Sequence, residues 1–233
     1  MGFGARLNAI AKWVPKGKKI VDVGTDHAYL PVLLAQEGKI SSAIAGDIAA
    51  GPCEAAQKTI DFYRLGNVIE VRSGNGLSIV VPGEVQVAVI AGMGGVTISE
   101  ILQANHKVFE SLERVVLQPM NGAELLRKWL LEHNWHLQAE DLVAESDKLY
   151  EIIVAEKGRG EMPQDDVYYE IGPLLLASRH QFLPEHMRRL VSKYTHLIAA
   201  MENSDNAKHS EKYQEFLRKK CKLEELYNEN YSS

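Results

Sequence analysis

The feature that most constrains this chain is a regular alternation of short apolar runs with longer amphipathic segments, which begins near residue 20. The short runs are six to eight residues long, are rich in Val and Ile, and read KIVDVG, SSAIAGDI, NVIEVRSG, VQVAVIAG and ERVVLQP. Buried parallel strands have this composition because helices cover both of their faces. The alternation therefore predicts a doubly wound α/β domain with a mostly parallel sheet.

Two further strands are predicted after the last of these helix-length segments. The stretch WHLQAEDLVAESDKLYEIIVAEKG has strand character on both sides of a polar turn at Glu145, Ser146 and Asp147. A short turn joins antiparallel strands, whereas parallel strands need a long crossover, so we expect a hairpin. A mostly parallel sheet of seven strands that ends in an antiparallel hairpin is typical of the Rossmann-like fold of class I methyltransferases.

The character of the sequence changes between Gly158 and Pro163, and the remainder is helical. Apolar residues recur at helical spacing along two stripes, Leu190, Tyr194, Leu197 and Met201 in the first and Tyr213, Phe216, Leu217, Leu223 and Tyr227 in the second. Ser204, Asp205 and Asn206 predict the turn between them. We therefore expect a methyltransferase domain at residues 1–159 and a C-terminal α-helical coiled-coil hairpin at residues 160–233.

Charge and targeting signals limit the classes of function. The chain carries 26 Lys and Arg against 31 Asp and Glu, a net charge of -5, which argues against non-specific coating of nucleic acid. Local basic clusters are still present near both ends of the sequence. An export signal and an apolar run of about 20 residues are both absent from the sequence, so we expect a cytoplasmic protein without a membrane anchor. The two cysteines predict no disulfide, and His133 and His136 lack the partners of a metal site, so no metal is expected.

Candidate ligand-binding residues follow the first two apolar runs. Ligands of an open α/β sheet bind at the carboxyl ends of the strands, beside the first strand. Gly24 ends the first run and allows a ligand to approach the backbone closely, although a simple strand-to-helix turn is an alternative. The sequence GTDHAY departs from G-x-G-x-x-G, which disfavours a pyrophosphate ligand. Asp47 ends the second run and can accept hydrogen bonds from two ribose hydroxyls, or it can cap the next helix.

The later strand ends carry groups suited to a flat, polar ligand. Asn75 and Gly76 follow the third run, where the amide can pair with an adenine edge, although Asn-Gly is also an ordinary turn. After the fourth run, glycine-rich backbone can form a pocket floor or allow close packing of strand and helix, in Ala91, Gly92, Met93, Gly94 and Gly95. After the fifth run, amide side chains can bind a purine edge, in Gln118, Pro119, Met120 and Asn121.

The motifs DVGTDHAYLP, GDI-x-x-GP, GNGL, AGMGG and LQP-x-N occur in this order and precede the predicted helical hairpin. In this combination the chain closely resembles, over essentially its whole length, the bacterial tRNA (adenine-22, N1)-methyltransferase family of the TrmK type. The resemblance implies S-adenosyl-L-methionine as methyl donor, S-adenosyl-L-homocysteine as product, and N1 of adenine 22 in tRNA as target. Residues assigned to the cofactor are Asp22, Gly24, Asp47, Ile48, Asn75, Gly76, Ala91 and Gly92, and those assigned to the substrate are Met93, Gly94, Gly95, Gln118, Pro119, Asn121, Arg188, Arg189 and Lys193.

The resemblance also implies that Asp26, His27 and Tyr29 face the cofactor and the target adenine. Adenine N1 has a lone pair that can attack the methyl group in line, so no base is needed to create the nucleophile. The product ring is cationic, and a carboxylate at its edge stabilises the developing charge or accepts an N6 proton. We therefore expect Asp26 to be catalytic, with His27 and Tyr29 positioning the base. Helix capping by Asp26 and core packing by Tyr29 are the alternatives.

Two other functions are compatible with these motifs. A methyltransferase for another RNA or for a small molecule would use the same chemistry, and a catalytically silent cofactor-binding RNA module would keep the same fold. The intact AGMGG and Asp26 favour an enzyme, and the helical hairpin favours a large substrate. On that hairpin, Arg188, Arg189 and Lys193 are expected to contact tRNA, although such charges are usually only a solvated face.

Overall fold

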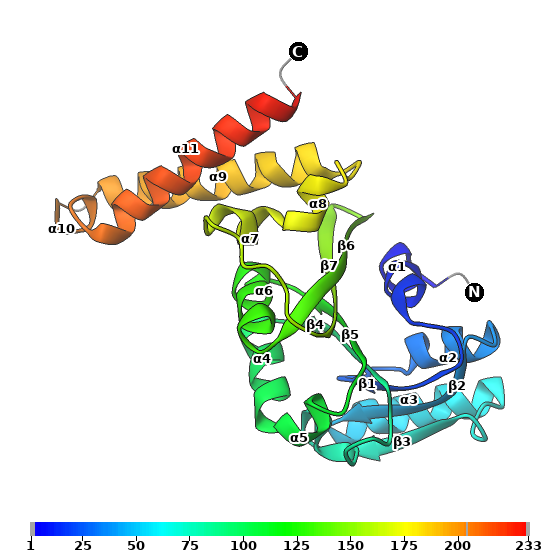
Figure 1. Ribbon diagram of the computed structural model, residues 1–233. Helices are drawn as coiled ribbons and strands as arrows, with labels where there is room; N and C mark the ends of the chain where they lie inside the picture. Colours follow the sequence, from blue (N-terminus) through cyan, green and yellow to red (C-terminus); the bar gives the residue numbers. More distant parts are fainter. Residues whose placement is uncertain (1–2, 204, 232–233) are drawn as a thin grey trace. The chain divides into compact units, whose positions relative to one another are not determined.

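The computed structural model describes residues 3–203 and 205–231, and it divides into two compact units, Met1–Met162 and Pro163–Ser233. Each unit is described by itself (Figure 1). The elements of the first unit are α1 (Ala5–Trp13), β1 (Lys18–Val23), α2 (Tyr29–Gln36), β2 (Ile40–Asp47), α3 (Ala50–Tyr63), β3 (Ile69–Ser73), the 3-10 helix η1 (Gly76–Ile79), β4 (Val87–Met93), α4 (Gly95–Ala104), α5 (His106–Phe109), β5 (Arg114–Pro119), α6 (Ala123–Glu132), β6 (Trp135–Glu145) and β7 (Lys148–Lys157). Those of the second are α7 (Val167–Ile171), α8 (Pro173–Ala177), α9 (Leu183–Glu202), α10 (Asp205–Lys208) and α11 (Glu211–Tyr231).

The first unit is built on one seven-stranded sheet with the order β3-β2-β1-β4-β5-β7-β6. The strands from β3 to β5 pair in parallel, and β7 runs antiparallel to both β5 and β6. In β1, Val21 pairs with Ile44 of β2 on one side and with Ala88 of β4 on the other. Strands β2 and β3 are added on one side of β1, and the strands from β4 onward are added on its other side. The switch point of the strand order therefore lies between β1 and β4. The predicted fold class, a mostly parallel sheet with a terminal hairpin, is confirmed.

Helices cover both faces of this sheet (Figure 1). One core holds Ile10 of α1, Leu34 of α2 and Ile60 of α3, and the other holds residues of α4, α5 and α6. Neighbouring residues of β1 point into different cores, because Ile20 belongs to the first and Val21 to the second. A strand that is buried on both faces needs a continuous apolar run rather than an alternating one, which is the pattern in the sequence.

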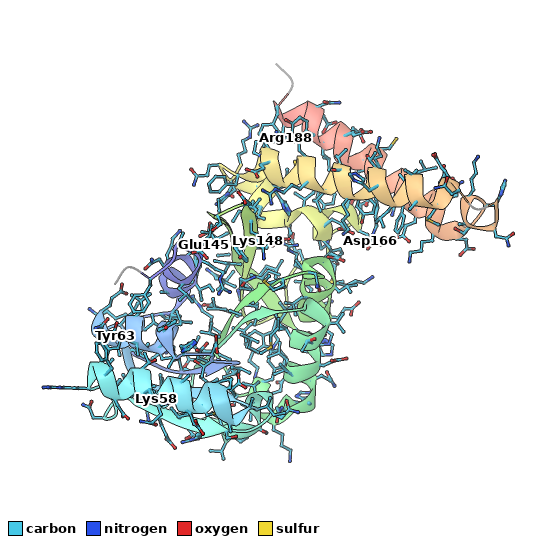
Figure 2. The ribbon with its side chains drawn as sticks, turned by 180° about the vertical axis from the view of Figure 1, so that it is seen from behind. Lys58, Tyr63, Glu145, Lys148, Asp166 and Arg188 are labelled. Carbon is cyan, nitrogen blue, oxygen red and sulfur yellow. The ribbon has the colours of Figure 1, made fainter. Side chains whose placement is uncertain are left out.

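A buried arginine joins the terminal hairpin to α6. The guanidinium of Arg127 on α6 donates to Glu140 of β6 at 2.5 Å and to Glu151 of β7 at 2.6 Å. The side chains of Arg127 and Glu140 are fully buried, so each charge depends on the other for compensation. Beyond this point the hairpin projects to the pair formed by Glu145 and Lys148 (Figure 2).

The second unit is a helical hairpin in which α9 and α11 lie side by side and antiparallel (Figure 1). Its buried face follows Tyr194 and Ile198 of α9 and Leu223 of α11. Leu197, which was expected on this face, is partly exposed because the buried residues of α9 recur every four positions from Leu190. Residues 204–206 were expected to form the turn. Ser204 lies outside the described residues, and α10 follows directly after it.

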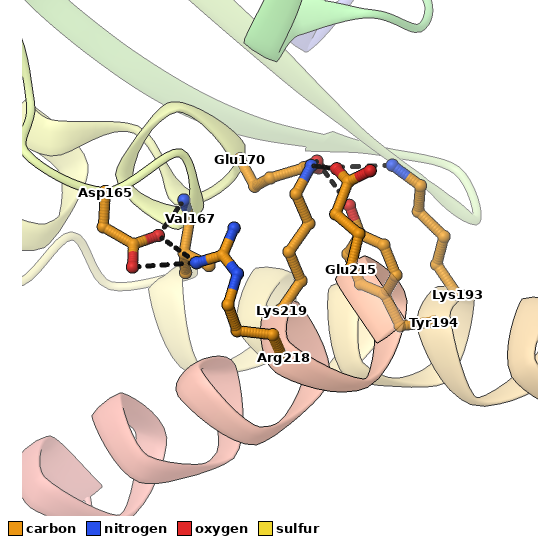
Figure 3. Close-up of polar contacts among 8 residues, drawn as sticks. All are labelled: Asp165, Val167, Glu170, Lys193, Tyr194, Glu215, Arg218 and Lys219. Atoms are coloured by element: carbon orange, nitrogen blue, oxygen red, sulfur yellow. Dashed lines mark hydrogen bonds and ion pairs between the residues drawn. The ribbon is translucent and has the colours of Figure 1, made fainter. Parts of the chain in front are cut away.

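One carboxylate connects three helices of this second unit (Figure 3). Glu170 of α7 is buried and accepts hydrogen bonds from the Tyr194 hydroxyl, from Lys193 Nζ at 3.2 Å and from Lys219 Nζ at 3.1 Å. Burial raises the pKa of the Glu170 carboxyl, but the Tyr194 hydroxyl and the two ammonium groups outweigh burial and hold this pKa below its ordinary value. The charged form of Glu170 is therefore part of the folded hairpin.

Replacing this carboxylate is expected to weaken the hairpin in a pH-dependent way. Glu170→Gln should lower the free energy of unfolding by about 2 kcal/mol at pH 7, because two ammonium groups lose their shared partner. A depressed folded pKa contributes its full stability above the unfolded value of about 4.5, so wild type should begin to lose this contribution below that value and lose it fully as the pH falls through the folded pKa. Urea unfolding of the full chain at pH 7 and pH 4, followed by circular dichroism, measures both effects.

Glu215→Gln is the matched control. Glu215 pairs with Lys219 from a side chain that is 45% exposed, so its loss should change the free energy of unfolding by less than about 0.5 kcal/mol. Equal losses in the two variants would contradict a special role for the buried carboxylate.

Candidate cofactor and substrate site

A cavity of about 370 Å³ opens at the carboxyl ends of β1, β2 and β4. Six residues expected at a ligand from the sequence line it, namely Gly24, Asp47, Ile48, Asn75, Gly76 and Met93. The cavity is also lined by residues of α4 and by the residue that follows it, none of which the sequence predicted, namely Thr97, Glu100, Ile101, Ala104 and Asn105. The only sequence signal for these five residues is that they recur about one helical turn apart in the segment that follows AGMGG. The cavity thus joins segments that are up to about 80 residues apart in the chain.

The turn at Gly24 sets the shape of this cavity. The amide groups of Gly24 and Thr25 both donate to the carbonyl of Gly46, at 2.8 and 2.9 Å, so the loops after β1 and β2 are joined directly. Gly24 has a φ of +75°, and a Cβ atom built on it would lie 2.2 Å from Met93 Cε. A side chain at this position would be strained and would displace Met93. A glycine is therefore required here by conformation and by close approach.

Asp47 stabilises the loop that precedes α3. Its Oδ1 accepts a hydrogen bond from the amide of Ala49 at 2.9 Å, and α3 begins one residue later, at Ala50, without a side-chain cap. Asp47 therefore does not cap α3, and its hydrogen bond lies within the loop that precedes this helix. The bond uses one oxygen of Asp47 and fixes the carboxylate at the rim of the cavity.

A second cavity, of about 290 Å³, brings together the residues expected to act on the substrate. Asp26, His27 and Tyr29 line it, and Gly24 belongs to both cavities. The rings of His27 and Tyr29 stack with centroids 5.1 Å apart, and His27 Nε2 lies 3.5 Å from Asp26 Oδ2. Asp26 makes no cap bond to α2, and Tyr29 is 45% exposed. The geometry therefore favours neither capping by Asp26 nor core packing by Tyr29.

Burial perturbs Asp22, which also lines the second cavity. Removal from water raises the pKa of the Asp22 carboxyl to about 6, an effect that the neighbouring Thr25 side chain opposes in part. Within the described residues, Asp22 forms no ion pair with a basic side chain, so its charge is uncompensated at neutral pH. Such a group is a candidate for binding a cation.

The glycines after β4 and the amides after β5 also come together. Gly95 donates its amide to the carbonyl of Asn121 at 2.8 Å, and a Cβ on Gly95 would lie 2.2 Å from the Gly122 carbonyl oxygen. Close packing of the β4 and β5 loops therefore accounts for Gly95. The Asn121 side chain lies over Gly94, 3.1 Å from where a Cβ would stand.

Gln118 is placed differently from the sequence expectation. Its side chain is fully buried, its Oε1 accepts from Arg6 Nη1 at 2.9 Å, and its Nε2 donates to the carbonyl of Pro119 at 3.0 Å. Both ends of the amide are engaged within the protein, so a direct contact of Gln118 with a purine edge would require these bonds to break.

The basic residues expected at tRNA lie on α9, in the second unit. Lys193 belongs to the Glu170 cluster, whereas Arg189 pairs with Glu185 at 2.5 Å. Arg188 Nε donates to the carbonyl of Pro184 at 3.3 Å, and its side chain extends from the helix (Figure 2). Much of the positive charge in this stretch is therefore balanced locally.

Across the described residues, no helix is long and apolar enough to cross a membrane, and no group of three His, Cys, Asp or Glu side chains is arranged to hold a metal ion.

The strand order, the terminal hairpin and a cavity at the switch point beside β1 together define a Rossmann-like methyltransferase of class I. Residues 20–223 match the family model described as TrmK, tRNA (adenine(22)-N(1))-methyltransferase. The chain belongs to this family, and the resemblance inferred from its motifs is confirmed.

Relatives of known structure or function match along the whole chain. The tRNA (adenine(22)-N(1))-methyltransferase of Bacillus subtilis strain 168 is 32% identical over 228 residues, which cover 96% of this chain and 94% of the relative. Streptococcus pneumoniae Sp1610, solved in complex with S-adenosyl-L-methionine, is 33% identical with a TM-score of 0.86 and covers 97% and 100% of the two chains. M. capricolum TrmK, solved with S-adenosyl-homocysteine, is 27% identical with a TM-score of 0.81 and covers 98% of each chain.

The raised pKa of Asp22 predicts that its charge destabilises the protein without ligand. The difference between 3.8 and about 6 corresponds to about 3 kcal/mol of preference for the neutral carboxyl. Asp22→Asn should therefore raise the free energy of unfolding by up to about 3 kcal/mol at pH 7.5. Because a raised folded pKa penalises the charged form only above the unfolded value, the gain should shrink as the pH falls from about 6 to 3.8.

Urea unfolding of both proteins at pH 7.5 and pH 4 measures this difference. Asp26→Asn is the control, since the Asp26 side chain is 80% exposed and its loss should have little effect. A stability difference between Asp22→Asn and wild type that is the same at both pH values would contradict the interpretation.

Proposed function

We propose that the protein transfers the methyl group of S-adenosyl-L-methionine to N1 of adenine 22 in tRNA. The observation that carries this proposal is the pair of cavities that meet at Gly24, one lined by Asp47 and Asn75 and the other by Asp26. Membership of the family and the S-adenosyl-L-methionine and S-adenosyl-homocysteine complexes of two relatives support the same cofactor. A cytoplasmic location is proposed because the substrate is tRNA.

The larger cavity fits the cofactor in size and in chemistry. Binding sites for ligands of this size are clefts of about 300 Å³ or more, and this cavity measures about 370 Å³. Asp47 at its rim offers a carboxylate for the ribose hydroxyls, and Asn75 offers an amide for the edge of the adenine. When bound, the cofactor supplies an electrophilic methyl group on a sulfonium. Gly24, shared by both cavities, lets this reacting centre lie against the backbone.

Asp26 is proposed to stabilise the charge that develops on the target adenine. In the reaction, the N1 lone pair forms a bond to the methyl carbon while the carbon–sulfur bond breaks toward sulfur, so positive charge moves onto the ring. A carboxylate acts on that charge most strongly in a place without water. Asp26 is well exposed in the free protein, and an adenine stacked on His27 and Tyr29 would cover it. The bound base would thus remove water from Asp26 and strengthen the interaction between this carboxylate and the ring.

The helical unit is proposed to add tRNA contacts through Arg188 and Arg189. Arg188 has no acidic partner among the described residues, and Arg189 forms an exposed ion pair with Glu185. Phosphates compete well with exposed ion pairs, which are weak. Lys193 was assigned the same role from the sequence, but such a contact would have to share its ammonium with Glu170.

Incubation with labelled S-adenosyl-L-methionine and a tRNA transcript tests the activity directly. Nucleoside mapping should locate 1-methyladenosine at position 22, and a transcript with guanine at position 22 should remain unlabelled. Label at another position would reject the assignment. In a salt titration of tRNA binding, Arg188→Gln with Arg189→Gln should flatten the slope, because fewer counterions are released. An unchanged slope would exclude these arginines as phosphate contacts.

Asp26→Asn separates chemistry from binding. The substitution keeps the shape of the side chain and removes its charge, so affinity for cofactor and tRNA should change little while single-turnover methyl transfer slows by about 10²-fold or more. Rapid-quench measurement at saturating cofactor and tRNA gives this rate. Transfer at the wild-type rate would show that the carboxylate does not act on the reacting ring.

A further inference from the structure

Three exposed apolar side chains lie where the loops after β4 and β5 meet. Gly95 and Gly122 are in close contact at this point. The three side chains belong to residues within three positions of that contact, and they are 50%, 46% and 52% exposed in Val96, Met120 and Leu125. Single exposed apolar residues are ordinary on a protein surface, whereas three that lie together form a patch that a ligand can cover.

Met120 connects this patch to both cavities. Its amide donates to the carbonyl of Met93 at 2.8 Å, and Met93 lines the larger cavity. Its Sδ accepts from Gln118 Nε2 at 3.7 Å, while Gln118 Oε1 accepts from Arg6, which lines the cavity that contains Asp26. Met120 is therefore one contact from a residue of the first cavity and two contacts from a residue of the second, and its backbone is fixed.

Methyl transfer to N1 requires the target adenine to leave its stack. Standard tRNA numbering places position 22 in the D stem of the cloverleaf. N1 lies on the edge of adenine that faces the opposite strand, so a methyl donor reaches it only after the base has turned out of the helix. Extrusion leaves a gap between the two neighbouring bases. Apolar side chains inserted between bases are a known means of holding such an unstacked step open.

We propose that Met120 is a positioning residue that enters this gap and keeps the target adenine out of the helix. The assignment rests on the proposed function, because it takes adenine 22 of tRNA as the target. In this arrangement the extruded adenine lies on the stacked rings of His27 and Tyr29, and the apolar surface of Val96 and Leu125 covers the bases next to the gap. The patch and the Asp26 cavity then form one continuous substrate surface.

The chemistry of methionine suits this role. Its side chain is long, unbranched and flexible, so it can fit between two bases. It carries no strong hydrogen-bonding group that would need a partner inside the stack. It is also neutral, and it therefore adds no positive charge beside a ring that becomes cationic during the reaction. A lysine or arginine at the same position would oppose the transfer.

Two tRNA transcripts test the assignment with the full chain. One is the ordinary transcript, and the other lacks the nucleotide opposite position 22, so that its adenine is bulged and already easy to extrude. At saturating cofactor and tRNA, Met120→Ala should slow single-turnover transfer to the ordinary transcript by about 10-fold or more, because the cost of unstacking is no longer offset. Transfer to the bulged transcript should change by less than about twofold. Affinity for S-adenosyl-L-methionine, measured by calorimetry, should stay at the wild-type value.

Two further substitutions separate apolar character from size. Met120→Leu keeps an apolar side chain and should retain at least about half of the wild-type rate on the ordinary transcript, whereas Met120→Gln has a similar length but a polar end and should be slow. Met162→Ala is the matched control, because Met162 has nearly the same exposure, 47%. Gly160, close to it in the chain, packs against Leu131 in the last turn of α6, the end away from the β5 loop. Met162→Ala should leave both rates unchanged.

Three results would overturn the proposal. Equal slowing of Met120→Ala on both transcripts would mean that Met120 supports the shape of the site and not extrusion of the base. A wild-type rate for Met120→Ala or for Met120→Gln on the ordinary transcript would mean that no apolar wedge is needed. Each of these outcomes leaves the proposed function intact, since wild type still methylates position 22. Wild type that does not methylate position 22 would reject the proposed function and this assignment together.

Discussion

The structure depends on β1, the parallel strand that is buried on both faces between β2 and β4. Because helices cover both faces of the sheet, the free edge at the carboxyl ends of the strands is where polar groups can meet without losing water entirely. The carbonyl of Gly46 accepts the amides of Gly24 and Thr25, which locks the loops after β1 and β2 together. Both cavities are therefore built around a single turn.

The two cavities at this turn differ in the charged groups that line them. The larger cavity has a carboxylate at its rim and amide or glycine backbone elsewhere, which suits a neutral nucleoside. The smaller cavity contains Asp22, Asp26 and Arg6, which suits groups that carry charge or acquire it. Burial of Asp22 makes its ionised form unfavourable in the free protein. The charged carboxylate therefore lowers the stability of the free protein at neutral pH.

The helical unit shows how local pairing reduces the charge that a sequence displays. The three basic positions Lys193, Arg218 and Lys219 all pair with carboxylates of the short segment before α8, and Figure 3 shows these contacts around Asp165 and Glu170. Each ammonium or guanidinium group bound in this way is less available to a polyanion. A cluster of basic residues in the sequence therefore overstates the positive charge that is available to a tRNA. The structure is needed to find the basic side chains that are not paired with carboxylates.

The sequence by itself determined the parallel sheet, its terminal hairpin and the strand-end residues on one side of the larger cavity, because strand period, turn chemistry and strand ends are local properties. Gly24, Asp47 and Asn75 follow successive strands, so parallel order alone gathers them. Only the tertiary structure decided that Arg6 reaches this edge, that Gln118 turns inward to hold it, and that Glu170 engages Lys193. These contacts join residues 23 to 112 positions apart, and they depend on which elements become neighbours, which no local pattern encodes.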